Sequence, residues 1–385
     1  MEAHRARGRE QDLLVELADG ARRPAIADVG LLGLSEVGDE LIVNVQARDL
    51  GLGSGGFDVV HVNLTRGLSG ERNEGPAHPH AMKLNYTSLQ HAVEPVEATR
   101  KGAPSRAHPE GRGQAGERIE LPLEQPVGVL ALHGQLAAVA WAFARARPDC
   151  RLGFVQTPGG ALPGGHSRIV RTLRERGLLA GHLTAGAAYG GEGEAVSTAG
   201  ALHHGLRTLG WDAVVCGPGP GIVGSSSPLG HGGMHALDSA HTALALGAPT
   251  LLVARMSSAD PRPRHRGISH HTLTVLDLLL EPVTVALPAG IRSPVGADLR
   301  ARLGSVFGAS AERGRPQLEL EVDRPTDRRP ASMARHDWRR APVDLPEYLA
   351  SGLPAETMGR VLVEDPLFFG AALAAGTVLA ELCAP

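Results

Sequence analysis

Lysine, aromatic residues and cysteine are all scarce in this sequence. Lys83 and Lys101 are the two lysines, so arginine supplies 36 of the 38 basic residues, a bias typical of a GC-rich genome. Aromatic residues make up 3%, which disfavours nucleic-acid binding because bases stack on aromatic rings. The three cysteines, Cys150, Cys216 and Cys383, are far apart and form no CxxC pair. Neither a disulfide framework nor a thiolate metal site is expected, and a reducing cytoplasm fits best.

Long apolar runs and a strong net charge are also missing. No uncharged apolar stretch reaches the roughly 18 residues of a membrane span, and the first residues lack the apolar core of a secretory signal. The net charge of −3 is small for 385 residues, so no strong field attracts nucleic acid or a membrane surface. We therefore expect a cytoplasmic protein with neither a nucleic-acid nor a membrane partner.

What the sequence does contain is a globular composition, with 42% hydrophobic and 21% charged residues, and enough length for about two domains. In residues 1–65, short alternating apolar runs separated by Gly-rich turns predict a small β-barrel or meander module. Residues 66–118 are rich in Gly, Pro, Arg and His and predict a linker or loop region. Residues 291–385 predict a C-terminal extension whose apolar last helix packs on the preceding domain.

Residues 119–290 predict an α/β domain, because short apolar runs alternate with helical stretches, as in a mainly parallel, Rossmann-like sheet with flanking helices. The predicted strands are Val127–Leu132, Leu152–Gln156, His182–Ala187, Ala213–Cys216, Thr250–Ala254 and Val283–Leu287. The predicted helices lie near 136–146, 167–176, 197–209, 234–246 and 270–280. Ser167, Ser197 and Ser269 occupy expected N-cap positions, and Gly177, Gly210 and Gly247 occupy expected helix ends.

The loops that follow these strands are long and rich in Gly and His, whereas the loops that follow the helices are short. Ligands of open parallel sheets bind at the carboxyl ends of the strands, which is where the long loops lie. This asymmetry is the strongest functional signal in the sequence. It predicts one ligand-binding crevice that contains the end of the first strand, the Gly217–Ser227 loop and the Arg262–His271 segment.

The Gly217–Ser227 loop is a candidate anion cradle. Its glycines allow close approach of the backbone, and its N–H groups precede a helix N-terminus that favours negative charge. It is neither a P-loop nor a GxGxxG fingerprint, and tight packing between strand and helix is the alternative interpretation. The candidate ligand-binding residues in this loop are Gly217, Gly219, Gly221, Gly224 and Ser225.

The Arg262–His271 segment carries three arginines and three histidines close to Asp260. Charge-assisted hydrogen bonds from arginine predict anion binding, and a polar loop held by internal hydrogen bonds is the alternative. A metal site at His265, His270 and His271 is disfavoured, because four intervening residues followed by adjacent histidines are not a standard ligand pattern. The candidate ligand-binding residues here are Asp260, Arg264, Arg266, Ser269 and His271.

Three histidines are candidate acid–base catalysts, because imidazole titrates near neutrality. They are His265 and His270 in the Arg262–His271 segment, and His133 after the first strand of the α/β domain. We therefore expect an anionic small-molecule ligand, phosphorylated or nucleotide-like. A non-catalytic metabolite sensor or partner-binding protein is the alternative. The sequence identifies no cofactor and leaves the oligomeric state, including a homo-oligomer, open.

Several motifs together resemble the bacterial family catalogued as domain of unknown function 3866. They are GLGSGGFDVV from Gly51, LNYTSLQ from Leu84, GPGPGIVG from Gly217, ADPRPRHRGISHHT from Ala259, and TMGR from Thr357 followed by EDPLFF from Glu364. The resemblance extends over nearly the whole chain, and the arginine–histidine motif is its most specific part. It implies an origin in actinobacteria or other high-GC lineages, in agreement with the arginine bias. It implies no activity.

Overall fold

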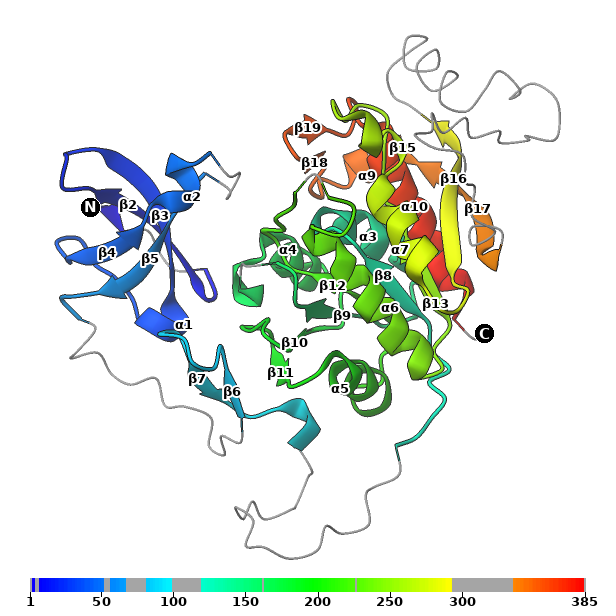
Figure 1. Cartoon of the computed structure of the whole chain (residues 1–385), viewed down its shortest axis with the longest axis horizontal. Coiled ribbons are helices and arrows are strands. Elements are labelled where there is room, and N and C mark those ends of the chain that lie inside the picture. The colour runs from blue at the N-terminus through cyan, green and yellow to red at the C-terminus, as the bar shows by residue number, and fades with distance from the viewer. Residues whose placement is uncertain are drawn as a thin grey trace, which may run out of the picture.

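A computed structural model describes residues 2–3, 7–51, 56–66, 81–98, 119–160, 163–225, 227–292 and 335–383. Much of the predicted linker and the first part of the predicted C-terminal extension therefore lie outside the described residues. Two bodies are visible in Figure 1, a small N-terminal sheet and a larger α/β body. Among the described residues, every helix is too short or too polar to cross a membrane.

The N-terminal body is a five-stranded sheet with the strand order β1-β2-β3-β5-β4. Three of its strand pairs are antiparallel, and one pair, β3 with β5, is parallel. The sheet is thus mixed and open, and the predicted barrel or meander is not confirmed. The parallel pair arises because β4 occupies the edge of the sheet and β5 then returns between β3 and β4. The elements are β1 Glu2–Ala3, β2 Glu10–Glu16, β3 Arg22–Asp28, α1 Val29–Leu32, β4 Leu41–Asn44, α2 Gln46–Asp49 and β5 Asp58–Asn63.

The larger body is built on an eight-stranded sheet with the order β11-β10-β9-β12-β8-β13-β16-β17, in which every pair is parallel. This confirms the α/β, Rossmann-like prediction. The six predicted strands are present, and two short or polar ones, β11 and β17, were missed. The strands are β8 Val127–Leu130, β9 Leu152–Thr157, β10 Gly181–Ala185, β11 Gly193–Ala195, β12 Ala213–Pro218, β13 Thr250–Val253, β16 Thr284–Arg292 and β17 Asp337–Asp344.

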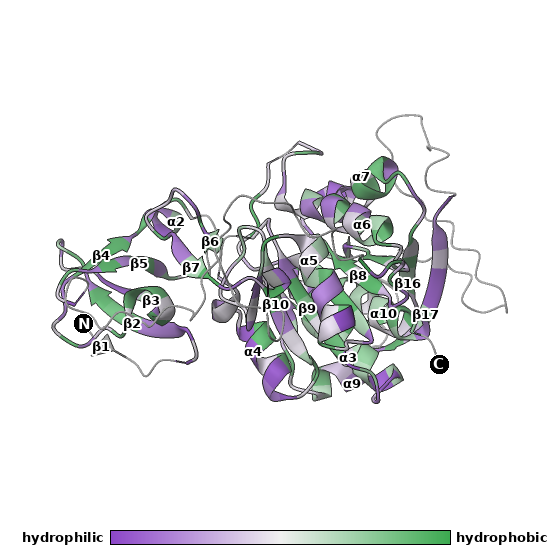
Figure 2. Ribbon diagram, turned by 90° about the horizontal axis from the view of Figure 1, so that it is seen from below, coloured by the Kyte–Doolittle hydropathy of each residue, from purple (hydrophilic) through white to green (hydrophobic). Residues whose placement is uncertain are grey.

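Helices cover both faces of this sheet (Figure 2), and the predicted N-caps Ser167, Ser197 and Ser269 are confirmed by side-chain hydrogen bonds to the first turns. One face packs against α3 Leu136–Ala146, α4 Arg168–Glu175, α9 Leu345–Ala350 and α10 Pro366–Glu381. The other face packs against α5 Thr198–His203, which continues as a π-helical turn His204–Thr208, and against α6 His235–Ala245 and α7 His270–Leu278. Buried apolar side chains on both faces hold the layers together.

A short hairpin, β6 Ala81–Lys83 and β7 His91–Val93, followed by the 3₁₀ turn Val96–Ala98, lies within the range predicted as linker. Lys83 is buried, and its ammonium donates to the carbonyl oxygens of Gly186, Ala188 and Ala195 at 2.8, 2.8 and 2.7 Å. Burial lowers the pKa of Lys83, against the opposing effect of Glu194 at 3.4 Å. The hairpin is therefore attached to the loop that follows β10 and to the end of β11.

Trp211 is buried under the sheet in a space that three glycines leave open. A Cβ atom added at Gly153, Gly181 or Gly205 would lie 1.8, 2.6 or 2.5 Å from the indole ring. Because interiors are close-packed, such contacts force the neighbours to shift. The indole thus takes the place of side chains on β9, β10 and the π-helical turn.

We predict that Gly153→Ala destabilises the protein by about 1–3 kcal/mol or more, the cost of overpacking a core. Trp211→Leu removes the ring that the new methyl group meets, so Gly153→Ala should cost less in that background. Urea unfolding of the four proteins of this double-mutant cycle measures the difference. An equal cost in both backgrounds would contradict the packing argument.

Candidate functional site

The carboxyl ends of four central strands, β9, β12, β8 and β13, lie side by side at one edge of the large sheet. The helices after β8 and β9 pack on one face, and those after β12 and β13 pack on the other. The connecting loops therefore diverge at this edge, the arrangement in which open α/β sheets bind ligands.

The first glycines of the Gly217–Ser227 loop serve close packing. A Cβ atom at Gly217 would lie 2.6 Å from the Cβ of Leu130, and one at Gly219 would lie 2.3 Å from the side-chain nitrogen Nε2 of Gln156. A Cβ atom at Gly160 would lie 2.2 Å from the carbonyl oxygen of Gly219. The loops after β9 and β12 thus run backbone against backbone, as in the packing interpretation of this loop.

The rest of this loop folds back on itself as a hairpin. Gly221 has a positive φ of 86°, Gly224 bridges to His231, and the Ser225 N–H donates to the Gly230 carbonyl at 2.7 Å. The Ser225 hydroxyl accepts a bond from the Ser227 N–H. The N–H of Ser225 is therefore hydrogen-bonded within the hairpin. The hairpin also places His231 at its base, opposite Gly224.

Four histidines pack together at the ends of β12 and β13, and we call His231, His265, His270 and His271 the histidine cluster. The rings of His231 and His271 are stacked, with centroids 3.4 Å apart. His265 lies 4.9 Å from His270 and 4.8 Å from His271, and the last two are 4.3 Å apart. Two segments distant in sequence, the hairpin after β12 and the Arg262–His271 segment, thus meet in this cluster.

The 3₁₀ turn Pro263–His265 and the start of α7 hold these rings in place. Ser269 is buried at the N-cap of α7, where its hydroxyl accepts from the His271 N–H and lies 2.7 Å from Nδ1 of His265. The Thr272 hydroxyl accepts a bond from the backbone N–H of Arg255 at 2.9 Å. Ser269, a predicted ligand-binding residue, therefore makes its hydrogen bonds within the protein.

Asp260, another predicted ligand-binding residue, is fully buried among three guanidinium groups. Its carboxylate oxygens lie 2.9 Å from Nε of Arg262, 3.4 Å from Nη2 of Arg255 and 3.6 Å from Nη2 of Arg360. Burial alone would raise the pKa of Asp260, but hydrogen bonds from Arg262 outweigh it and leave the pKa below its usual range. The carboxylate is ionised and holds the arginines together.

A second buried carboxylate, Asp365, adjoins this network. It accepts bonds from the hydroxyl groups of Ser257 and Ser258, and its Oδ2 lies 3.1 Å from Nε of Arg360. Arg360 is in the hairpin formed by β18 Glu356–Thr357 and β19 Arg360–Val361. The C-terminal part of the chain is therefore tied to the loop after β13.

The two predicted ligand arginines, Arg264 and Arg266, are exposed at the rim of this network. Nε of Arg264 lies 3.4 Å from Nε2 of His265, and Nε of Arg266 donates to the Asp260 carbonyl at 3.0 Å. Arg264 thus stands at the solvent side of the histidine cluster, and Arg266 at the solvent side of Asp260.

Burial lowers the pKa of the cluster histidines, and nearby arginines add to the effect. The pKa falls to about 3 for His265, to about 4 for His270 and to about 2 for His271, and it is also lowered for His231. The rings are therefore neutral at pH 7. Neutral imidazole offers one lone pair and one N–H group, so these rings are suited to accept hydrogen bonds or to bind a metal.

His133, at the end of β8, contacts a different set of side chains. Its Nε2 is 2.7 Å from the Ser167 hydroxyl, and its ring lies 5.8 Å from the ring of Phe154, on which His182 stacks. Burial lowers the pKa of His133 to about 4. The Arg262–His271 segment and the β12 loop meet directly, whereas a single crevice that also includes His133 stays a prediction.

Sequence reasoning missed His231, Arg255, Arg360 and Asp365. His231 follows a Gly-rich loop. Arg255 follows an apolar strand, and nothing in the sequence indicates that its side chain is buried. Arg360 and Asp365 fall in the TMGR and EDPLFF motifs. The resemblance of these motifs to the family was the only feature of the sequence that drew attention to these two residues.

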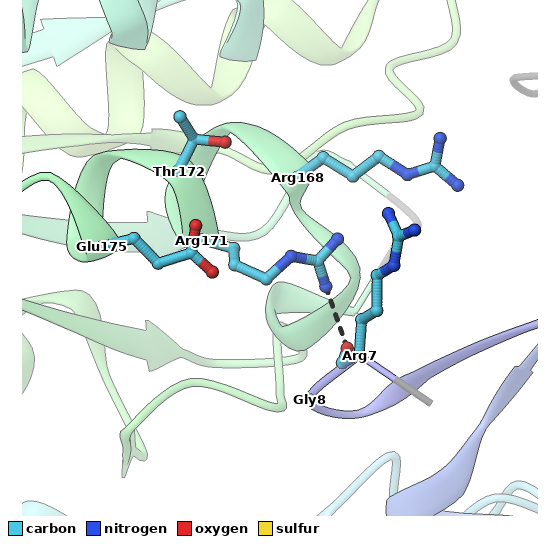
Figure 3. Close-up of a pocket in the computed structure, with 6 residues that line it drawn as sticks. All are labelled: Arg7, Gly8, Arg168, Arg171, Thr172 and Glu175. Carbon is cyan, nitrogen blue, oxygen red and sulfur yellow. Dashed lines mark hydrogen bonds between the residues drawn. The ribbon is translucent and has the colours of Figure 1, made fainter. Parts of the chain in front are cut away.

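A separate hollow of about 500 Å³ lies where the N-terminal sheet meets α4 (Figure 3), lined by Arg7, Gly8, Arg168, Arg171, Thr172 and Glu175. Arg168 pairs with Glu10 at 3.2 Å and with Asp12 at 3.1 Å. Arg171 donates to the Arg7 carbonyl, as Figure 3 shows. The arginines that line this hollow are therefore paired with groups of the N-terminal body. For this reason we place the candidate site at the carboxyl edge of the large sheet instead.

Comparison with known proteins identifies one family. The model of a protein family of unknown function, DUF3866, matches residues 25–376. That range includes the histidine cluster and both buried carboxylates, and it confirms the resemblance drawn from the motifs. Comparisons with curated proteins and with solved structures found no match.

We predict that the protein loses stability steeply below about pH 6.5. The folded pKa values of His133, His265 and His271 lie below the value of about 6.5 for an unfolded histidine. The unfolded chain therefore binds protons that the folded chain does not, so stability is complete above about pH 7 and falls as the pH drops toward 4. Three such groups contribute up to about 4 kcal/mol per pH unit.

Urea unfolding at pH 8, 7, 6 and 5 measures this slope. His265→Asn should flatten it, whereas His61→Asn, at an exposed position of β5, should leave it unchanged. A free energy of unfolding that stays constant from pH 7 to pH 5 would show that the buried rings are not the cause.

Proposed function

Because the chain belongs to the DUF3866 family, whose description names no activity, we propose its function from the carboxyl edge of the sheet alone: the protein binds an anionic small molecule there, phosphorylated or nucleotide-like. The observation that carries this proposal is an excess of positive charge around two buried carboxylates. Arg255, Arg262 and Arg360 bring three guanidinium groups to two carboxylates, Asp260 and Asp365.

The uncompensated charge has hydrogen-bond donors available for a ligand. Nε of Arg255 is buried and has no hydrogen-bond partner among the described residues, and the buried Nη2 of Arg360 has only its long 3.6 Å ion pair with Asp260. Guanidinium groups only donate, so an oxyanion is the natural partner for both. The exposed Arg264 and Arg266 add positive charge at the rim, where it attracts an anion from solvent.

An anionic ligand also makes acid–base catalysis by the histidines feasible. Without one, His265 and His270 have pKa values of about 3 and 4 and hold no proton at pH 7. A negative charge close to an imidazole favours its protonated form and raises its pKa. We propose that ligand binding moves these rings toward the range in which a general acid or base is effective. Binding without turnover would indicate the alternative, a metabolite sensor.

We also propose a cytoplasmic location, supported by three unpaired cysteines, Cys150, Cys216 and Cys383. Burial raises the pKa of the Cys216 and Cys383 thiols to about 12, so neither is a reactive thiolate at neutral pH.

The corresponding prediction is that thiol titration of the unfolded protein, purified without reductant, counts three free groups per chain. A count of one would indicate a disulfide and contradict the proposed location. Cysteine-free protein of the same length serves as the blank.

For the anion site we predict that Arg264→Ala and Arg266→Ala each weaken binding by about 1.5–3 kcal/mol, the range for a charge-assisted hydrogen bond. Their melting temperatures should change little, because exposed arginines contribute little to the core. Calorimetry with inorganic phosphate and with adenosine monophosphate measures both affinities.

Arg145→Ala is the matched control, since Arg145 is an exposed arginine on α3 that lies over the Trp141 ring and pairs with Glu347. It should bind as the wild type does. If neither phosphate nor the nucleotide binds the wild type, or if all three variants weaken binding equally, the anion proposal is wrong.

A further inference from the structure

Three imidazole rings of the histidine cluster are close enough to share one ion. Ligand atoms of His265, His270 and His271 all lie within 4.8 Å of one another. Bonds of about 2.0–2.1 Å in a tetrahedral site place two nitrogens about 3.4 Å apart. Side-chain rotations that move each ring by less than about 1 Å would bring the three nitrogens to that separation.

Nitrogen atoms in this cluster also lack partners. Nε2 of His270 is buried and has no hydrogen-bond partner among the described residues, and the same holds for both ring nitrogens of His231, a side chain that is 7% exposed. A buried polar atom without a partner is costly and calls for an explanation, such as an ion. An ion bound to the cluster would take up the lone pair of His270.

The surroundings of His265 resemble those of a metal ligand. Its Nδ1 lies 2.7 Å from the buried Ser269 hydroxyl, which leaves Nε2 as the nitrogen for an ion. In the structure this Nε2 accepts a 3.4 Å bond from Nε of the exposed Arg264. A ligating histidine commonly uses its second ring nitrogen for a hydrogen bond that fixes the orientation of the ring. The N-cap of α7 supplies that bond.

We propose that His265, His270 and His271 bind one divalent late transition-metal ion, of the class of zinc, with His231 stacked beside them. Imidazole ligands favour such ions, whereas magnesium and calcium require oxygen ligands. The carboxylate closest to the cluster in sequence, Asp260, is held by arginines. Three histidine ligands leave a fourth position open, which is the arrangement of catalytic rather than structural zinc sites.

Two arginines compete with this ion. The exposed Arg264 donates to Nε2 of His265 at 3.4 Å, a long bond that solvent can replace. The second competitor is buried. Nη1 of Arg255 lies 3.0 Å from Nδ1 of His271, and arginine only donates, so this nitrogen accepts the bond. A metal bound at Nδ1 would replace the arginine, and a metal bound at Nε2 would leave the proton on Nδ1. Either geometry releases Arg255 from His271. Metal binding therefore frees a guanidinium group at the edge where the anion is proposed to bind.

The inference does not rest on the proposed anion site, because it concerns the ion alone. Full-length protein without a purification tag is stripped with a chelator and dialysed against Zn²⁺, Co²⁺ or Mg²⁺ in phosphate-free buffer. We expect one zinc or cobalt ion per chain and no magnesium by elemental mass spectrometry. Phosphate titration of the metal-free protein tests the anion proposal separately, so the two can fail independently.

Variants then assign the ligands. His270 is only half-buried, so His270→Ala should fold, and it should bind cobalt at least about 100-fold more weakly, beyond the 10–100-fold effect of an outer-shell partner. His61→Ala, an exposed histidine on β5, should bind as the wild type does. X-ray absorption of the zinc-loaded wild type, which requires no variant, should show three imidazole ligands.

Any of three results would overturn the proposal. The first is a wild-type protein that retains no zinc or cobalt after dialysis. The second is a zinc spectrum with fewer than three imidazoles. The third is a His270→Ala variant that binds cobalt as tightly as the wild type does.

Discussion

The carboxyl edge of the large sheet depends on one ionic contact, the buried carboxylate of Asp260 among the guanidinium groups of Arg255, Arg262 and Arg360. A charge removed from water is stable only when it is paired and hydrogen-bonded. If the carboxylate were absent, like charges from the loop after β13 and from β19 would face one another in a medium of low dielectric constant. Removing one partner of a buried pair costs about 3–5 kcal/mol for this reason. The carboxylate thus holds together segments that lie about 100 residues apart in the chain.

The positive charge of these arginines also lowers the pKa values of the neighbouring histidines. Together with burial, it opposes protonation of His265, His270 and His271, so their lone pairs remain available at neutral pH. A proton and a metal ion compete for those lone pairs, but the ion gains several coordinate bonds at once, whereas a proton gains one. An anion bound nearby would reduce the repulsion that either cation meets. The two proposed ligands, one negative and one positive, can therefore be bound together at this edge. A metal-bound His265 or His270 would then position the ion and would no longer act as an acid or base.

Local pattern was sufficient to predict most of the α/β body, because the strands at its centre are uninterrupted apolar runs and its helices carry serine caps and terminal glycines. β11 has three residues, and β17 contains two adjacent arginines, so neither has an apolar pattern to detect. The open N-terminal sheet depends on which strands pair, and a strand pattern does not encode that. At the site, the residue types of Asp260 and Ser269 suggested ligand contacts, but their burial turns them toward the protein. His231 and Arg360 join the site only through the fold, across gaps that no sequence spacing reveals.

Lys83 has a consequence for how this sequence can change. Its ammonium directs three N–H groups to three carbonyl oxygens at 2.7–2.8 Å in a buried position. A guanidinium group is planar and larger, and its donors point outward within one plane, so it cannot reproduce this convergence. A coding bias that favours arginine over lysine therefore meets a steric barrier at Lys83. An exchange for arginine at this position would require repacking where the β6–β7 hairpin joins the sheet.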